Sequence, residues 1–247
     1  MIKFSKENAK TKKLRKVAEL AGYLAGKRKI YSLDLISGHS CPGAHKCLSK
    51  VVILDGKRRI QDGKDCEFRC FAASQEVLFP ALYDLRMHNF NTLRKLRSVK
   101  QCVTMIESSM PANLGIMRYH AGGGFFNRYY FQAAIQVAKN HPDRLFYAYV
   151  KNLPLLEGVD WVDSASGVLL PNFLITASRG GRYDRLIEPL NMREAVVIKR
   201  VADATMEIDD NDSHAATPGG SFNLLIHGTQ PRGTDAAKAV AEQRKKR

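Results

Sequence analysis

The stretch GIMRYHAGGGFFNRYYFQAAIQVAKNHPDRLFYAYVK, residues 115–151, contains all the parts of one β-α-β unit. The apolar runs 115–120 and 144–151 are typical of short buried strands, and the segment 126–142 between them favours a helix. Strands joined through a helix run parallel, because a parallel connection needs a crossover of about a dozen residues or more. This stretch therefore predicts an α/β fold with a parallel sheet.

Four further apolar runs extend the same pattern along the chain. They cover residues 30–37, 172–179, 194–200 and 222–228, and they bring the expected strands to six. Short apolar runs that alternate with helical segments are typical of βαβ units. We expect a six-stranded parallel sheet of the (β/α)6 partial TIM-barrel type.

The region between the first two expected strands holds additional elements. Residues 50–64 favour a hairpin, with Asp-Gly turns at 55–56 and 62–63. Residues 72–96 and 98–109 favour helices, and Pro80 is expected to break or kink the first of them.

Composition divides the chain into three parts. Residues 1–29 are rich in lysine, and the spacing of the apolar residues predicts a basic helix over 5–27, with an apolar face of Leu14, Val17, Leu20 and Leu24. Residues 30–235 form the expected α/β domain. Residues 236–247 form a basic C-terminal tail, expected to be a final helix or a frayed end.

Length and hydropathy predict a cytoplasmic protein. The chain has 247 residues, of which 45% are hydrophobic, so it can bury one full-sized core. No apolar run reaches the roughly 18 residues of a transmembrane helix. The first residues, MIKFSKENAKTKKLRK, are too charged for the apolar part of a signal peptide. We therefore expect no membrane association and reduced thiols.

The formal net charge of +15 predicts a polyanionic partner. Nucleic acid is the first candidate, and an anionic small molecule is the second. No zinc-finger, RNP or KH signature is present, so the charge indicates no particular class of nucleic-acid-binding domain. A generally basic surface is the alternative.

Four of the five cysteines lie between residues 41 and 70. In a reducing compartment such grouping favours metal or redox chemistry over disulfides. The spacings are C-x5-C and C-x3-C, whereas zinc sites use C-x2-C pairs. Wider spacing favours an iron–sulfur cluster, which we expect to be of the 4Fe–4S type. Zinc and purely structural thiols remain alternatives. The expected ligands are Cys41, Cys47, Cys66 and Cys70.

Two further residues, His45 and the fifth cysteine, are assigned other roles. His45 is a candidate non-thiol ligand or hydrogen-bond donor to the cluster. Cys102 falls in an expected helix and is interpreted as a buried small hydrophobic residue.

Polar and cationic side chains end five consecutive expected strands. The carboxyl ends of parallel strands share one edge of the sheet, where ligands gather. These residues therefore predict an anion-binding site, although any strand that leaves a core turns polar. Glycines after a strand can bring backbone amides to a phosphate or carboxylate, and a tight turn without a ligand explains them equally well. The candidate ligand-binding residues are His120, Gly122, Gly123, Lys151, Ser178, Arg179, Lys199 and His227.

The acidic segment EIDDNDSHA, residues 207–215, allows two interpretations. It could bind a hard cation or supply an acid/base pair such as Asp212 and His214. A solvated acidic loop is the favoured alternative.

A cysteine loop after the first strand and glycines after the second resemble the radical S-adenosylmethionine enzymes. The resemblance implies an iron–sulfur cluster at the first loop and S-adenosylmethionine at the glycines. The chain lacks the C-x3-C-x2-C motif of that superfamily. If all four cysteines bind iron, no iron is open to S-adenosylmethionine.

Several blocks more closely resemble the gene product 88 family of bacteriophages. They include SCPGAHKC, FRCFAASQE, DRLFYAYVKNLP, LITASRGGRYD, IDDNDSHA and LLIHGTQP. The resemblance covers roughly residues 30–235 and implies a phage-encoded protein in the cytoplasm of a bacterial host, where a host protein is a possible partner.

Two functional hypotheses follow. In the first, the chain is an iron–sulfur protein that resembles a radical enzyme and acts on an anionic ligand at the strand ends. In the second, it is a non-enzymatic module that binds nucleic acid or a host protein through its basic ends, with a structural or redox-sensing cluster.

Overall fold

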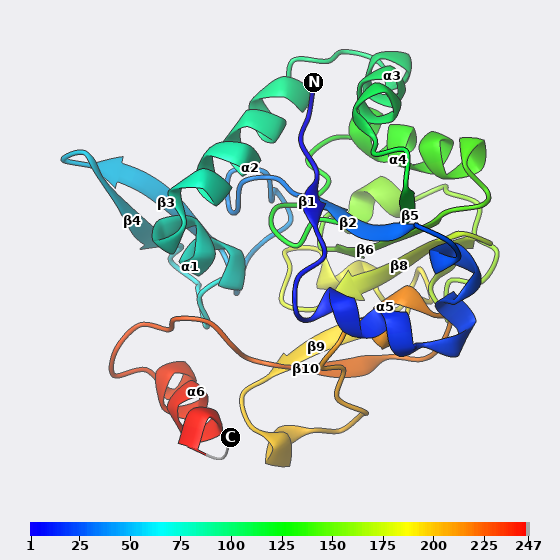
Figure 1. The fold of residues 1–247 in the computed structure, drawn as a ribbon. Helices are drawn as coiled ribbons and strands as arrows, with labels where there is room; N and C mark the ends of the chain where they lie inside the picture. The colour runs from blue at the N-terminus through cyan, green and yellow to red at the C-terminus, as the bar shows by residue number, and fades with distance from the viewer. Residues whose placement is uncertain (246–247) are drawn as a thin grey trace.

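The computed structural model describes residues 1–245, and an eight-stranded mixed sheet lies at its centre (Figure 1). The strand order is β1-β2-β5-β6-β8-β9-β10, with β7 beside β8. The strands from β2 to β10 along this order all pair in parallel, whereas β1 and β7 are antiparallel to their neighbours. Their bounds are β1 Ser5–Lys6, β2 Lys29–Leu33, β5 Leu114–Tyr119, β6 Leu145–Val150, β7 Val168–Leu170, β8 Phe173–Ser178, β9 Glu194–Ile198 and β10 Phe222–Leu225.

The parallel part of the sheet follows the order of the sequence, so all six expected strands are confirmed. The sheet is open within the described residues: its edge strands are β1 and β10, and no closed barrel forms. Sequence patterning missed β1 and β7, which have two and three residues and are too short for a detectable period.

Both faces of the sheet are covered, which explains why its strands are continuously apolar. Helices α3 (Val99–Ser109) and α4 (Arg128–Asn140) lie on one face, and α5 (Ser213–Ala216) with the N-terminal turns lies on the other (Figure 1). Alternate residues of β5 therefore enter different cores: Tyr119 packs against α4, and Ile116 packs against the N-terminal turns.

The N-terminal segment is not the continuous basic helix that we expected. It forms three 3-10 turns, at Thr11–Lys16, Ala18–Leu20 and Gly22–Leu24. The backbone is extended at Val17, between the first two turns. Leu14 and Leu20 are buried against the sheet. Packing of these leucines on the sheet determines the course of the N-terminal backbone, because a short isolated helix has little stability of its own.

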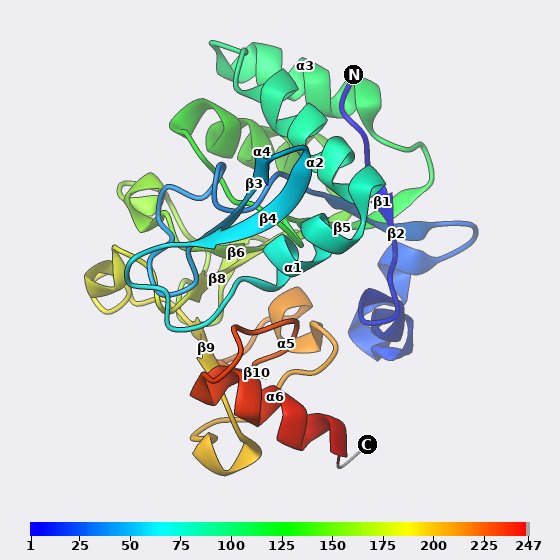
Figure 2. The same cartoon turned by 90° about the vertical axis from the view of Figure 1, so that its left-hand side faces the viewer.

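The expected hairpin is confirmed as a separate two-stranded sheet of β3 (Ser49–Leu54) and β4 (Lys57–Asp62). Its turn residues Asp55 and Gly56 both have positive φ, as a type I′ turn requires. The hairpin packs on α1 (Phe71–Leu78), apart from the large sheet (Figures 1 and 2).

The expected break at Pro80 is also confirmed, because α1 ends at Leu78 and α2 (Pro80–Leu93) begins at this proline. Proline suits the first position of a helix, where its missing N–H has no partner to lose.

The remaining elements are short, apart from the last. They are the 3-10 turns Leu153–Leu156, Asp184–Leu186 and Val201–Asp203 and the helix α6, Asp235–Lys245. The expected C-terminal tail is thus a helix as far as Lys245, and residues 246–247 lie outside the described part. None of the helices in residues 1–245 is long and apolar enough to cross a membrane.

Candidate functional site

The cysteine-bearing segments meet at the carboxyl end of β2. Cys41 lies in the loop after this strand, and Cys70 directly precedes α1. Hydrogen bonds from Ser37 to the buried Glu76, which is itself ion-paired, join the two segments. The Glu76 carboxylate of α1 accepts a hydrogen bond from the Ser37 amide at 3.1 Å and lies 2.9 Å from the Arg86 guanidinium of α2. These contacts hold the loop after β2 against the start of α1.

The four clustered thiols interact electrostatically although 29 positions separate the first from the last. Burial raises the pKa of Cys41 to about 12, and the thiols of Cys70 and Cys47 raise it further. Burial also raises the pKa of Cys70 to about 12, again with a contribution from Cys47. Burial raises the pKa of Cys66, which Asp62 and Cys47 also raise. All five cysteines are free thiols.

Polar donors surround these sulfur atoms. The backbone N–H groups of Ala72 and Ala73 favour the thiolate form of Cys70. The backbone of Gly38 and the side chain of Ser40 do the same for Cys41. Such donors stabilise metal-bound thiolates and tune the potential of iron–sulfur clusters.

The thiols nevertheless do not form a metal-binding cluster in this structure. Within residues 1–245 no three His, Cys, Asp or Glu side chains gather closely enough to hold one metal ion. Tetrahedral zinc with bonds of about 2.3 Å brings its thiolates to within about 4 Å of one another. The arrangement therefore does not match a preformed zinc site.

The other two sequence candidates have different surroundings. His45 Nδ1 lies 3.6 Å from a carboxylate oxygen of Asp65. Cys102 is buried in α3 within the apolar core, in agreement with its interpretation as a small hydrophobic residue.

The segment RGGR, residues 179–182, packs against the first cysteine loop. The Lys46 amide donates to the Gly180 carbonyl at 3.0 Å, and the Arg182 amide donates to the Gly43 carbonyl at 2.9 Å. Gly43 also lies against the backbone of Lys151: a Cβ atom built on it would be 2.4 Å from the Lys151 carbonyl oxygen. The turn CPGA, residues 41–44, therefore packs against the carboxyl ends of the neighbouring strands β6 and β8.

Gly43→Ala should consequently destabilise the protein by about 1–3 kcal/mol, because the added methyl group meets backbone that cannot rotate away. Urea unfolding measures the loss. Gly219→Ala is the matched control, since a Cβ atom there meets nothing within 4 Å. Equal stability of the two variants would contradict this close packing of Gly43 on Lys151.

Three of the expected ligand-binding residues lie beside this loop. The Lys151 ammonium donates to the Ser178 carbonyl at 2.7 Å and to the Arg179 carbonyl at 2.6 Å. The Arg179 guanidinium pairs with Glu194, with one contact of 2.9 Å. Both cations thus have partners within the chain, and anion binding by them stays a prediction.

The other expected cations also have neighbours within the chain. Lys199 pairs with Asp235 at 2.9 Å. The centre of the His227 ring lies 4.1 Å from the centre of the Phe71 ring. The buried His120 ring lies 2.9 Å from the Tyr130 hydroxyl.

Close packing explains two of the expected ligand-binding glycines. A Cβ atom on Gly122 would lie 2.7 Å from the Arg86 guanidinium carbon. Gly123 has a φ of +88°, and a Cβ atom there would lie 2.5 Å from the Ser40 hydroxyl oxygen. Gly122 thus lets the loop after β5 pack against α1 and α2, and Gly123 lets it pack against the loop after β2.

His120 predicts a specific pH dependence of stability. Burial, helped by Arg118, lowers its pKa from 6.5 to about 3. Between pH 6.5 and about 3, the unfolded chain binds a proton at His120 that the folded chain does not. The free energy of unfolding therefore falls as the pH is lowered through this range. The contribution is up to about 1.4 kcal/mol per pH unit.

His120→Asn should reduce that slope, and asparagine tolerates the left-handed φ of +67° at this position. Urea unfolding at several pH values across the window measures it. An unchanged slope would contradict a neutral, buried His120.

With this geometry established, comparison with known proteins adds one finding. The family model described as Gene product 88 matches residues 2–246. The chain belongs to the gene product 88 family. No match was found among curated proteins or among solved structures. The family resemblance seen in the sequence is thus confirmed, whereas the radical S-adenosylmethionine resemblance is not shown.

This member of the gene product 88 family also contains a buried charge network that sequence reasoning missed. Asp212 is completely buried and pairs with the Arg118 guanidinium of β5, and with the Lys10 ammonium at 2.8 Å. The hydroxyl groups of Tyr147 and Tyr149 also donate to its carboxylate. Part of the acidic loop is therefore an internal ion pair and not a solvated surface.

Two signals in the sequence could have revealed this network. Arg118 is the one charged residue within the apolar run GIMRYH, and Asp212 is one of four acidic residues in EIDDNDSHA. A charge in a strand that is buried on both faces needs a partner of opposite sign.

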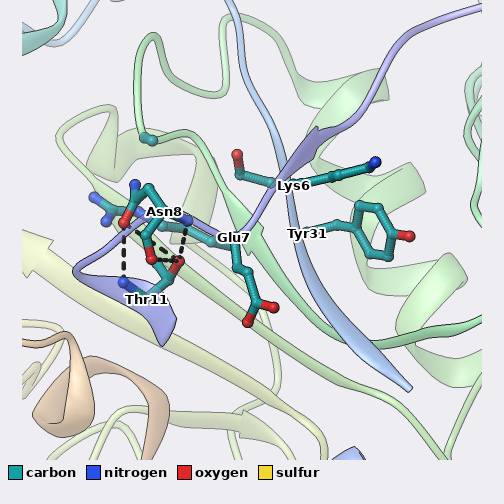
Figure 3. A pocket seen from close by; sticks show the side chains of 8 residues that line it. Lys6, Glu7, Asn8, Thr11 and Tyr31 are labelled. Carbon is teal, nitrogen blue, oxygen red and sulfur yellow. Dashed lines mark hydrogen bonds between the residues drawn. The ribbon is translucent and has the colours of Figure 1, made fainter. Parts of the chain in front are cut away.

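A small cavity borders Arg118, between the N-terminal segment and the strands β2 and β5. Its volume is about 10 Å³, which is about the space of one water molecule. Figure 3 shows Asn8 and Thr11 at its wall, joined by hydrogen bonds. The protein's own side chains thus fill the space around this ion-pair network and leave no room for a small-molecule ligand.

Proposed function

We propose that this protein binds an iron–sulfur cluster through Cys41, Cys47, Cys66 and Cys70 at the carboxyl end of β2. The observation that carries the proposal is that the segments bearing these cysteines are in contact: the Ser49 hydroxyl lies 3.6 Å from the Cys66 sulfur and accepts a hydrogen bond from the Cys70 amide at 3.2 Å, and the Glu67 amide, beside Cys66, donates to the carbonyl of Lys46, beside Cys47, at 2.8 Å. A bound cluster would supply one-electron transfer.

The donor set fits a cluster better than a single ion. Each iron of a 4Fe–4S cluster takes its own thiolate, so the ligands stand farther apart than around zinc. The backbone N–H groups facing Cys41 and Cys70 supply the donors that thiolate ligands need.

The topology of the open parallel sheet supports this position for the site. The six parallel strands follow sequence order, and the cysteine loop leaves the end of the first of them. We restrict the proposal to electron transfer and exclude S-adenosylmethionine from it. With four protein thiolates no iron is open, and Gly122 and Gly123 are required for packing.

The nucleic-acid hypothesis gains little from the N-terminal segment. Lys10, Lys13 and Arg15 pair with Asp212, Asp210 and Glu7, so part of this basic charge is neutralised within the chain. A phage origin and a bacterial host cytoplasm, which the family resemblance implies, stay predictions.

Anaerobic reconstitution with ferrous iron and sulfide tests the proposal. We expect bound iron and acid-labile sulfide in similar amounts, a broad visible absorption, and a paramagnetic signal after reduction with dithionite. A colourless protein that contains no iron and binds one equivalent of zinc would contradict it.

A further inference from the structure

We propose that the free edge of strand β4 pairs with the same edge of a second copy of this chain, which gives a twofold-symmetric dimer. The two β4 strands run antiparallel in this dimer, are centred on Ile60, and join the two hairpins into one four-stranded sheet. The inference concerns self-association of the chain and does not depend on the proposed cluster.

Strand β4 has one paired edge and one free edge. The pair Leu54–Lys57 closes the two-residue turn and is hydrogen-bonded, and non-hydrogen-bonded and hydrogen-bonded pairs alternate from there. The backbone N–H and C=O groups of Arg58, Ile60 and Asp62 therefore point away from β3. No group in the described part of the chain hydrogen-bonds to these backbone groups. The edge is thus a row of unused donors and acceptors.

Neighbouring segments cover other edge strands of the fold. The carbonyl of Val51 in β3 points away from β4 and lies 3.1 Å from His39 Nε2. In β10, the Asn223 amide donates to the Glu207 carbonyl at 2.7 Å, and the Asn223 carbonyl accepts from the Asp209 amide at 2.9 Å. Strand β1 has only two residues. Proteins cover or shorten edge strands to prevent pairing with other chains, whereas β4 offers six residues and stays open.

The position of the hairpin allows a second copy to approach. The hairpin stands at the periphery of the molecule, apart from the large sheet (Figures 1 and 2). Helix α1 and the loop that contains His39 contact the hairpin from its inner face and from the β3 side. The β4 edge is opposite the β3 edge, so these contacts leave it open.

The sequence of β4 is self-complementary in one antiparallel register. When Ile60 lies opposite Ile60 of the second copy, the outward backbone groups of both strands face one another as hydrogen-bonded pairs. Arg58 then lies opposite the second copy's Asp62, and Arg59 lies opposite its Gln61. Twofold symmetry repeats each contact, so the dimer contains two Arg58–Asp62 pairs.

Neighbouring registers place like charges together. A shift of two residues in one direction sets Arg59 opposite itself, and a shift in the other direction sets Arg58 opposite Lys64. Like charges directly opposite one another destabilise a strand pair. The charges of β4 therefore specify one register, and they disfavour the alternatives.

Both members of the expected ion pair have unused hydrogen-bonding capacity. Arg58 Nε is buried without a hydrogen-bond partner in the described chain, and the Arg58 guanidinium lies 5.7 Å from the centre of the Tyr83 ring. Asp62 pairs with Arg69 at 2.6 Å, and the Asp62 side chain is 25% exposed. A carboxylate has about four acceptor sites, so Asp62 can bind the second copy's Arg58 and keep Arg69.

Exchanging charges between the two strands tests the inference. Arg58→Asp sets two carboxylates opposite each other at both ends of the strand pair, and Asp62→Arg sets two guanidinium groups there. A mixture of the two variants restores opposite charges at both ends. Arg59→Asp is the matched control, because it makes the same charge change on the same strand opposite the neutral Gln61. Analytical ultracentrifugation from about 1 μM to about 1 mM measures the association.

We expect the wild type to pass from monomer to dimer in this range, since a small interface gives weak association. Arg58→Asp and Asp62→Arg should each weaken the dimer by about tenfold or more, and Arg59→Asp should weaken it by less than about threefold. The mixture should form a heterodimer about as tight as the wild-type dimer. A wild type that stays monomeric, or equal losses from Arg58→Asp and Arg59→Asp, would overturn the inference.

A backbone variant keeps the test decisive if Asp62→Arg, beside Arg69, fails to fold. Ile60→Pro removes the central N–H donor, which points away from β3, so the hairpin itself loses no ladder hydrogen bond. Circular dichroism and urea unfolding check that the variant is folded. We expect a folded Ile60→Pro to be monomeric, and dimerisation as tight as that of the wild type would show that β4 is not the interface.

Discussion

Replacing Cys41 or Cys70 with serine should abolish cluster binding, with iron content falling to near zero after anaerobic reconstitution. A serine hydroxyl is a much poorer ligand for iron than a thiolate, and each of these residues lies among the other thiols. Iron and sulfide analysis with visible absorption measures the effect. The same loss is expected for Cys47→Ser and Cys66→Ser.

Cys102→Ser is the matched control. This residue is buried in α3, away from the cysteine loops, so the variant should lose stability and keep its iron. Thermal unfolding of each apoprotein separates loss of ligand from loss of fold. Full iron content in Cys41→Ser and Cys70→Ser, or bleaching by Cys102→Ser, would show that the ligand assignment is wrong.

Asp212→Asn should be the most destabilising single substitution among the polar residues discussed here, at about 3–5 kcal/mol. Asparagine keeps the size of the side chain but removes the negative charge that compensates Arg118, which is itself mostly buried. Removing one partner of a buried ion pair leaves an uncompensated charge in the interior. Urea unfolding measures the change in free energy.

Asp210→Asn is the control two residues away. Its carboxylate pairs with Lys13 at 2.9 Å but is 69% exposed, so its removal should cost less than about 1 kcal/mol. Similar losses from the two variants would contradict a buried role for Asp212.

The Asp212 pair also has a defined pH dependence. Burial opposes ionisation, but Arg118 and Lys10 outweigh it and lower the pKa of Asp212. The contribution of the ionised carboxylate is therefore fully present above the unfolded pKa of about 4 and is lost as the pH falls further. Asp212→Asn should be less sensitive than the wild type to acid in this range.

Much of the fold could be predicted because local patterns determine it. The run 115–151 alone specifies strand, helix and strand, and all six parallel strands were found at the expected places. The turn at Asp55–Gly56 and the helix start at Pro80 were predictable for the same reason. Each depends on the backbone preferences of one or two residues.

The path of the N-terminal segment could not be predicted in this way. Its apolar spacing matches a helix, but Leu14 and Leu20 are buried through three separate turns. Neither the two-residue strand β1 nor the partners of Lys10 and Lys13 leaves a periodic signal in the sequence.

The sequence by itself determined the order of strands and helices and the grouping of cysteines between residues 41 and 70. Only the tertiary structure decided which of these groups meet. It brought Cys41 near Cys70, placed Asp212 on Arg118 and gave Lys151 and Arg179 partners within the chain. Local preferences act between neighbouring residues, whereas ion pairs and thiol contacts depend on segments that become adjacent only when the sheet and its covering layers pack together.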